Sequence, residues 1–63
     1  MSYQPEPKFL EGDYIYYKDF LYQIDKISWQ DFYQQWYYLI HGVDVRSAEL
    51  VEIAKGNEYF RKA

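Results

Sequence analysis

Short runs in which apolar and polar residues alternate follow one another along this chain, a pattern typical of half-buried β-strands. The first run, residues 14–17, is separated from the second, residues 20–29, by the polar pair Lys18-Asp19, which has the length of a tight hairpin turn. The alternation of the second run slips at Asp25-Lys26. This slip predicts a bulge or bend that turns the following side chains back toward the core.

The second half of the chain is predicted to hold a loop and three more short strands. The loop spans residues 30–35, and the strands span residues 36–40, 43–45 and 50–53, with one helical turn over residues 47–50 before the last strand. Residues 1–8, with two prolines, predict an extended, mobile arm. Residues 54–63 predict a polar C-terminal tail in which a frayed helical turn packs Tyr59 or Phe60 against the body.

Five short strands with tight turns predict an all-β domain, either a small barrel or two packed sheets. The side chains predicted to form its core are Ile15, Tyr17, Tyr22, Ile24, Ile27, Tyr37, Leu39, Val45, Leu50 and Ile53. The third strand is the least determined, because both of its faces are apolar. A shift of one residue there would exchange Tyr37 and Leu39 for Trp36, Tyr38 and Ile40.

Aromatic residues are more numerous than one small core needs, with nine Tyr, four Phe and two Trp among 63 residues. Consecutive aromatic residues in a strand point to opposite faces, so some rings must reach the surface. Exposed aromatic patches are typical of binding surfaces. We therefore expect a protein partner to bind a surface made of Tyr14, Tyr16, Trp29, Phe32, Tyr33, Trp36 and Tyr38.

The net charge of −3 and the dispersed basic residues disfavour general nucleic-acid binding, which depends on Lys and Arg contacts to phosphates. Acidic residues near the aromatic runs favour a partner with a basic patch; they are Asp13, Asp31, Asp44 and Glu49. The chain has no Cys, which excludes a disulfide scaffold. No run is apolar enough to span a membrane, and the N-terminal residues lack the pattern of a signal peptide, so we expect a cytoplasmic protein.

Candidate catalytic and metal-binding residues are scarce. The single His, His41, stands at a predicted strand end, and Ser28 is far from it in sequence. A metal site would need several His, Cys or clustered carboxylates. The acidic residues that could flank His41 are only Asp44 and Glu49, which are separated in sequence. We therefore expect no enzymatic activity, no catalytic residues, no metal and no cofactor.

Three other uses of the aromatic surface remain open. An aromatic cage could hold a methylated ammonium group between several rings and a carboxylate; its candidates are Tyr14, Tyr16, Trp29, Phe32 and Tyr38 with Asp13 or Asp31. Nucleic-acid bases could stack on the same rings, with Lys26 and Arg46 contacting phosphates. The surface could also bury itself against a second copy of the chain.

Four segments together resemble small SH3-like barrels of the KOW and Tudor kinds. They are Gly12-Asp13-Tyr14-Ile15, Leu21-Tyr22-Gln23-Ile24 with Ile27, Tyr37-Tyr38-Leu39, and Ser47-Ala48-Glu49-Leu50-Val51-Glu52-Ile53. The resemblance covers residues 9–53. It implies a five-stranded SH3-like barrel with a short helical turn before the last strand.

The resemblance implies a binding module rather than a particular partner. SH3-like barrels bind proline-rich peptides, methylated tails, RNA and protein surfaces, and they occur among small adaptors and inhibitors and among accessory proteins of phages and mobile elements. The motifs of proline-peptide-binding SH3 domains, an Ala-Leu-Tyr-Asp-Tyr string and a Trp-Trp pair, are absent here. The Gly expected in a KOW hairpin is also missing at Lys18-Asp19.

Overall fold

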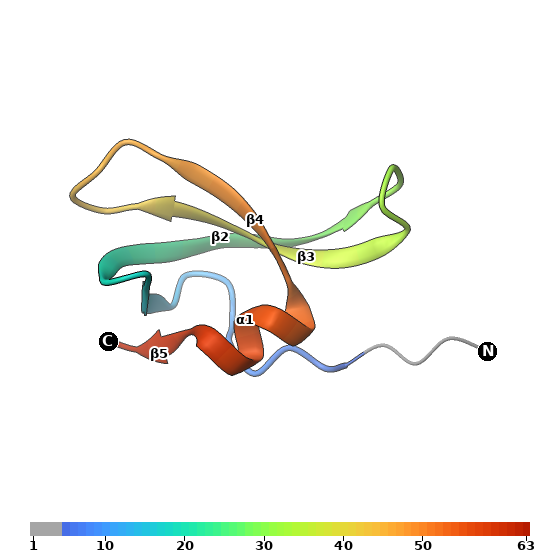
Figure 1. Cartoon of the computed structure of the whole chain (residues 1–63), viewed down its shortest axis with the longest axis horizontal. Helices are drawn as coiled ribbons and strands as arrows, with labels where there is room; N and C mark the ends of the chain where they lie inside the picture. Colours follow the sequence, from blue (N-terminus) through green and yellow to red (C-terminus); the bar gives the residue numbers. More distant parts are fainter. Residues whose placement is uncertain (1–4) are drawn as a thin grey trace.

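The protein is an all-β domain of five antiparallel strands with one short helix before the last strand (Figure 1). The computed structural model describes residues 5–63. The strands lie in the order β4-β3-β2-β1-β5 in a single open sheet. The elements are β1 (Tyr14–Tyr17), β2 (Phe20–Gln30), β3 (Gln35–Gly42), β4 (Ala48–Glu52), α1 (Ile53–Tyr59) and β5 (Arg61–Lys62). The predicted all-β fold with five strands and a short helical element before the last strand is confirmed.

The turn between β1 and β2 is the predicted two-residue hairpin. Lys18 and Asp19 both have left-handed backbone conformations, with φ of 53° and 67°. Two consecutive positive φ angles match the right-handed twist of the flanking strands, which is why Asn-Gly or Asp-Gly usually fills this position. Asp19 is of a residue type enriched in this conformation, whereas Lys18 is of a type that seldom adopts it.

The predicted irregularity in β2 is also confirmed. The register between β2 and β3 shifts between Ile24 and Lys26, so that Asp25 is the extra residue. Because of this bulge, Ile24 is buried and Ile27 also packs against the core. The backbone N–H of Ile27 points away from β3, and the Glu11 carboxylate accepts its hydrogen bond at 3.0 Å.

The core lies inside the bend of the sheet. It consists of Phe9, Ile15, Tyr17, Tyr22, Ile24, Tyr38, Ile40, Val51, Ile53 and Phe60. Five of the predicted core residues are in this cluster, and Ile27 packs beside it. Tyr37 is buried as predicted but lies outside the cluster.

The predicted inward face of β3 is wrong by one residue. Tyr38 and Ile40 point into the core, while Leu39 is only half-buried. Ile40 pairs with Ile24 and Tyr38 pairs with Ile27, so the face of β2 that the bulge sets determines the face of β3. Leu50 pairs with Leu39 and is therefore directed outward as well.

Two predicted elements in the second half are also corrected. Residues 43–45 form the loop between β3 and β4 rather than a strand, so Val45 is only partly buried. The helical turn predicted at residues 47–50 is the start of β4, which pairs with β3 from Ala48 onward. The helix lies after β4 instead.

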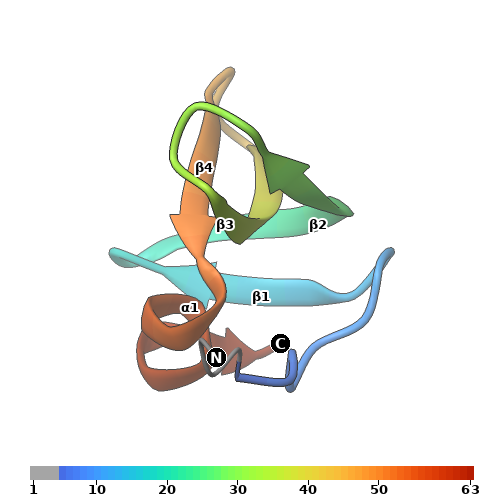
Figure 2. The same ribbon diagram turned by 90° about the vertical axis from the view of Figure 1, so that its right-hand side faces the viewer.

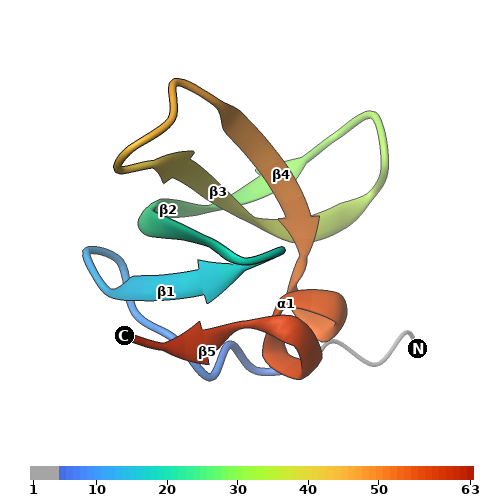
Figure 3. The same ribbon diagram turned by 60° about the vertical axis from the view of Figure 1, so that its left-hand side comes forward.

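The predicted C-terminal tail is part of the domain. Figure 3 shows α1 connecting β4 to β5, which runs alongside β1. Ile15 pairs with Lys62 and Tyr16 with Arg61. Phe60, between α1 and β5, packs its ring 5.2 Å from that of Tyr17. Phe60 is therefore the aromatic residue of the predicted tail that packs on the body.

The N-terminal arm predicted for residues 1–8 lies partly outside the described residues. Residues 5–8 have no regular secondary structure. Lys8 N–H donates to the Tyr38 hydroxyl and to Asn57 Oδ1, each at 3.0 Å, and Asn57 Nδ2 donates to the Glu6 carbonyl at 2.8 Å. These bonds fasten the segment to β3 and α1.

Candidate functional site

The end of the β2–β3 hairpin extends past the neighbouring strands. β1 pairs with β2 only over residues 20–23, and β4 pairs with β3 only over residues 37–41. Beyond those points the hairpin has no strand on either side, and Figure 1 shows its turn extending beyond α1. Figure 2 views the molecule from this end. The hairpin end therefore projects from the sheet, and large side chains are exposed along it.

One face of this end carries the two tryptophans. Trp29 pairs with Trp36 directly across the ladder, two residues beyond the Ile27–Tyr38 pair and on the same face. Their ring centroids are 5.7 Å apart at an interplanar angle of 67°, an edge-to-face contact. The Trp29 indole N–H donates to Asp31 Oδ1 at 2.7 Å. These contacts orient rings that are still 40% and 41% exposed.

The other face carries a row of three rings. The Tyr33 ring lies 5.0 Å from that of Phe32 and 5.5 Å from that of Tyr37. Phe32 is 84% exposed and Tyr33 is 56% exposed, whereas Tyr37 is buried beneath them. Burial, and secondarily the charge of Glu52, raise the pKa of the Tyr37 hydroxyl. The row therefore rests on a neutral, packed ring.

The turn that presents these rings is held by its own hydrogen bonds. The N–H groups of Tyr33 and Gln34 donate to the Gln30 carbonyl at 3.1 and 2.7 Å. The Gln34 side chain donates to the Asp31 carbonyl at 2.8 Å. Gln34 itself has a φ of 55°. A turn with this many internal bonds presents its rings in a defined arrangement.

Four of the seven residues predicted to bind a partner come together on this hairpin. We call Trp29, Phe32, Tyr33 and Trp36 the aromatic hairpin. Tyr14 and Tyr16 are half-exposed as predicted, but they lie on the outer face of β1, where Tyr14 pairs with Gln23. Gln23 is roughly 20 Å along β2 from Trp29. The predicted surface is therefore two separate patches.

The predicted exposure of Tyr38 is wrong, because its side chain is completely buried. It pairs with Ile27 and Val51, both on the core side of the sheet. The burial of Tyr38 also removes one ring from the candidate aromatic cage. Of the five rings proposed for it, one is inside the core and two are on β1, so they do not converge around Asp13 or Asp31.

The residues considered for other chemistry lie apart. Lys26 is in the middle of β2 and Arg46 is in the β3–β4 loop. Ser28 pairs with Tyr37, which is four residues from His41 on β3, so the two are roughly 13 Å apart along the strand. Among residues 5–63 no three His, Asp or Glu side chains gather as a metal site would require. Over the same residues there is no helix both long and apolar enough to cross a membrane.

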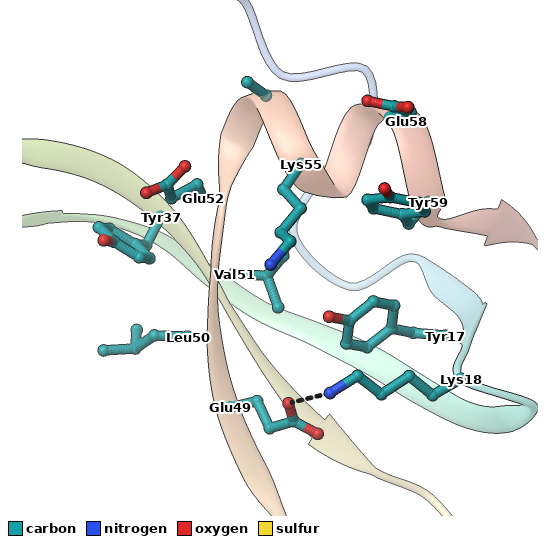
Figure 4. A pocket seen from close by; sticks show the side chains of 11 residues that line it. Tyr17, Lys18, Tyr37, Glu49, Leu50, Val51, Glu52, Lys55, Glu58 and Tyr59 are labelled. Carbon is teal, nitrogen blue, oxygen red and sulfur yellow. Dashed lines mark ion pairs between the residues drawn. The ribbon is translucent and has the colours of Figure 1, made fainter.

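A second feature, which the sequence did not predict, is a pocket of about 560 Å³ between β4, α1 and the end of β1 (Figure 4). At one end of it, Lys18 Nζ lies 3.7 Å from Glu49 Oε1 and 5.1 Å from the centre of the Tyr17 ring. The Tyr22 hydroxyl donates to Glu49 Oε2 at 2.9 Å. Its walls join the end of β1 to β3, β4 and α1, which come much later in the sequence, so no local pattern could have indicated it.

Three comparisons with known proteins gave no match: no family model, no curated protein and no solved structure is similar to this chain. The function must therefore be argued from the surface itself.

Proposed function

We propose that this protein is a non-enzymatic, SH3-like binding module that inserts its aromatic hairpin into a groove of a protein partner. Its strand order and the short helix before the last strand support the SH3-like assignment that the sequence resemblance suggested. Such a module would act as an adaptor or a small inhibitor.

The observation that carries the proposal is the exposure of large rings on both faces of one projecting hairpin. A flat docking face would need its rings on one side only. A hairpin with exposed aromatic rings on both faces instead fits between the two walls of a groove. Trp and Tyr dominate the energies of protein interfaces, and they lose little conformational freedom on binding. The exposed ring of Phe32 at the tip would be the first to enter.

The charges around the hairpin favour a partner with a basic groove. Asp31 adjoins Trp29, and Glu52 is close enough to Tyr37 to raise the pKa of its hydroxyl. The whole chain carries a net charge of −3. Complementary charge at the rim of an interface raises the association rate and selects among partners.

The test is a quantitative pull-down from the native lysate with the tagged chain, with and without nuclease. We expect a protein that survives nuclease, and we expect Phe32→Ser to weaken its capture. Loss of a buried aromatic anchor costs about 2 kcal/mol or more, which is roughly a thirtyfold loss of affinity. Trp36→Ser should act in the same direction.

The matched control is Tyr16→Ser, which removes an aromatic ring exposed to 48% on β1, away from the hairpin. It should leave capture unchanged. Equal loss with Tyr16→Ser would place the binding surface elsewhere. Capture that disappears with nuclease would show that the rings stack on nucleic-acid bases instead.

A further inference from the structure

β4 is an edge strand, and its hydrogen-bonding pattern identifies which of its backbone groups are free. The Gly42 N–H donates to the Ser47 carbonyl at 2.8 Å, just before the β3–β4 ladder begins with His41 opposite Ala48. In an antiparallel ladder, hydrogen-bonded and non-hydrogen-bonded pairs alternate. The Glu49 and Val51 backbones are therefore bonded to β3, whereas the N–H and C=O groups of Ala48 and Leu50 point to the open edge.

An open edge of this kind is a template for another strand. The Leu50 side chain lies on the outer face and is 40% exposed, next to its cross-strand neighbour Leu39. A strand added beside β4 would therefore find main-chain partners at two residues and an apolar contact on the outer face. On the inner face, its side chains would enter the pocket of Figure 4.

Two lysines and three glutamates line this pocket, and one of the two cations, Lys55, reaches into it. Figure 4 shows Lys55, from α1, reaching over Val51 into the pocket, whereas the carboxylates of Glu52 and Glu58 are directed away from its centre. The Lys18–Glu49 pair is the one ion pair within residues 5–63, so over those residues Lys55 has no carboxylate within 4.0 Å. Glu49 is already engaged by Lys18 and by the Tyr22 hydroxyl.

We propose that β4 binds an extended, acidic segment of a protein partner by strand addition. The backbone of the segment bonds to Ala48 and Leu50, an apolar side chain packs on Leu50, and a carboxylate on the inner face pairs with Lys55. This mode of recognition combines main-chain bonds with side-chain pockets at alternate positions. It is a second binding site, separate from the aromatic hairpin.

A second copy of the chain fits this edge less well. If two β4 strands paired antiparallel about Leu50, the acid delivered toward Lys55 would be Glu49 of the other copy. That carboxylate is held by the ion pair and hydrogen bond within its own chain. A partner segment with a free carboxylate meets no such competition.

The test is an NMR titration of the isotope-labelled full chain with the peptide acetyl-Thr-Val-Glu-Val-Thr-amide, up to millimolar concentration. In this peptide the Glu and the two Val side chains face opposite sides, as the pocket and Leu50 require. We expect saturable shifts of the Ala48, Leu50 and Lys55 amides. The same peptide with Lys in place of Glu should bind roughly tenfold more weakly, because it loses the charge-assisted contact.

Three variants separate the contributions. Leu50→Pro removes an N–H that points to the open edge and breaks no ladder bond, so it should fold and lose the β4 shifts. Lys55→Gln should weaken the Glu peptide roughly tenfold and should not weaken the Lys peptide. The control is Lys26→Gln, which removes the charge of an exposed side chain on β2, and this variant should bind as the wild type does. If Leu50→Pro does not fold, the Lys55 variant and the two peptides still test whether β4 binds the acidic segment.

Four outcomes would overturn the proposal. The first two are that the β4 amides stay fixed at millimolar peptide, or that they shift equally with both peptides. The third is a shift with protein concentration alone, which would make a second copy the occupant. The fourth is that inorganic phosphate reproduces the Lys55 shift while Leu50 stays fixed with the peptide, which would mean a simple anion site without strand addition.

Discussion

Tyr38 joins three parts of the chain that are separate in sequence. Its hydroxyl donates to Asn57 Oδ1 at 2.5 Å and accepts the backbone N–H of Lys8 at 3.0 Å and of Phe9 at 3.4 Å. Burial raises the pKa of this hydroxyl, and the two N–H groups act in the opposite direction. A buried Tyr usually finds a polar partner for its hydroxyl, and here that hydroxyl links the N-terminal segment to α1.

We predict that Tyr38→Phe keeps the packing of the ring but lowers the free energy of unfolding by about 1–3 kcal/mol, because it leaves the buried Phe9 N–H without its hydrogen-bond partner. Urea unfolding followed by circular dichroism measures the change. Tyr16→Phe is the control, since an exposed hydroxyl contributes within about 0.5 kcal/mol. Equal midpoints for the two variants would contradict the role given to the Tyr38 hydroxyl.

The residues that the sequence placed correctly are those with an unambiguous alternation. Ile15 and Ile24 stand between more polar or more exposed neighbours, so their inward direction followed from period two. The run Tyr37-Tyr38-Leu39-Ile40 is apolar on both faces, and its direction is fixed only by pairing with β2 and β4. The four rings of the aromatic hairpin were predictable because two lie in the predicted loop and two flank it, whereas Tyr38 was not.

At the scale of elements, α1 owes its existence to packing rather than to propensity. It has seven residues, no side-chain hydrogen bond at its N-terminus, and Gly56 at its middle. Such a helix is not stable alone, and the sequence therefore predicted only a frayed helical turn within residues 54–63. Gly56 is buried against two rings. A Cβ atom at this position would lie 2.5 Å from the Tyr38 ring and 2.9 Å from that of Phe60, so only glycine fits.

We therefore predict that Gly56→Ala destabilises the protein, although Ala favours an isolated helix by about 1 kcal/mol over Gly. The added methyl group would displace two packed rings, and overpacking of this kind costs about 1–3 kcal/mol. Thermal unfolding measures the net change. The matched variant is Ala54→Gly, on the exposed side of α1. It should lose only the stability that comes from the higher helix propensity of Ala over Gly. A raised melting temperature for Gly56→Ala would show that the helix moves freely on the sheet.

At the scale of the whole molecule, the sheet is completed by its smallest strand. β5 has two residues and follows Phe60, which packs against Phe9, Tyr17 and Tyr38. Two charged residues carry no alternation, so the sequence could predict only a tail there. The pocket beside β4 escaped prediction for a related reason: it depends on how three separate elements meet.

We predict that a chain cut after Ile53 does not fold. Loss of a buried Phe alone costs about 3–5 kcal/mol, and a domain of this size has a total stability of about 3–9 kcal/mol. The amide proton spectrum of residues 1–53 should show the narrow dispersion of an unfolded chain. A well-dispersed spectrum would mean that the predicted boundary at residue 53 was correct after all.

The pairing of β1 with β5 has a consequence for the order of events during synthesis. β2, β3 and β4 are consecutive and can associate through local contacts, which form quickly. β1 instead must wait for Arg61 and Lys62 before its second edge is covered. Until then a nascent chain presents a bare strand edge flanked by Tyr14 and Tyr16. We therefore expect the partly synthesised domain to be the form most prone to aggregation and to capture by chaperones.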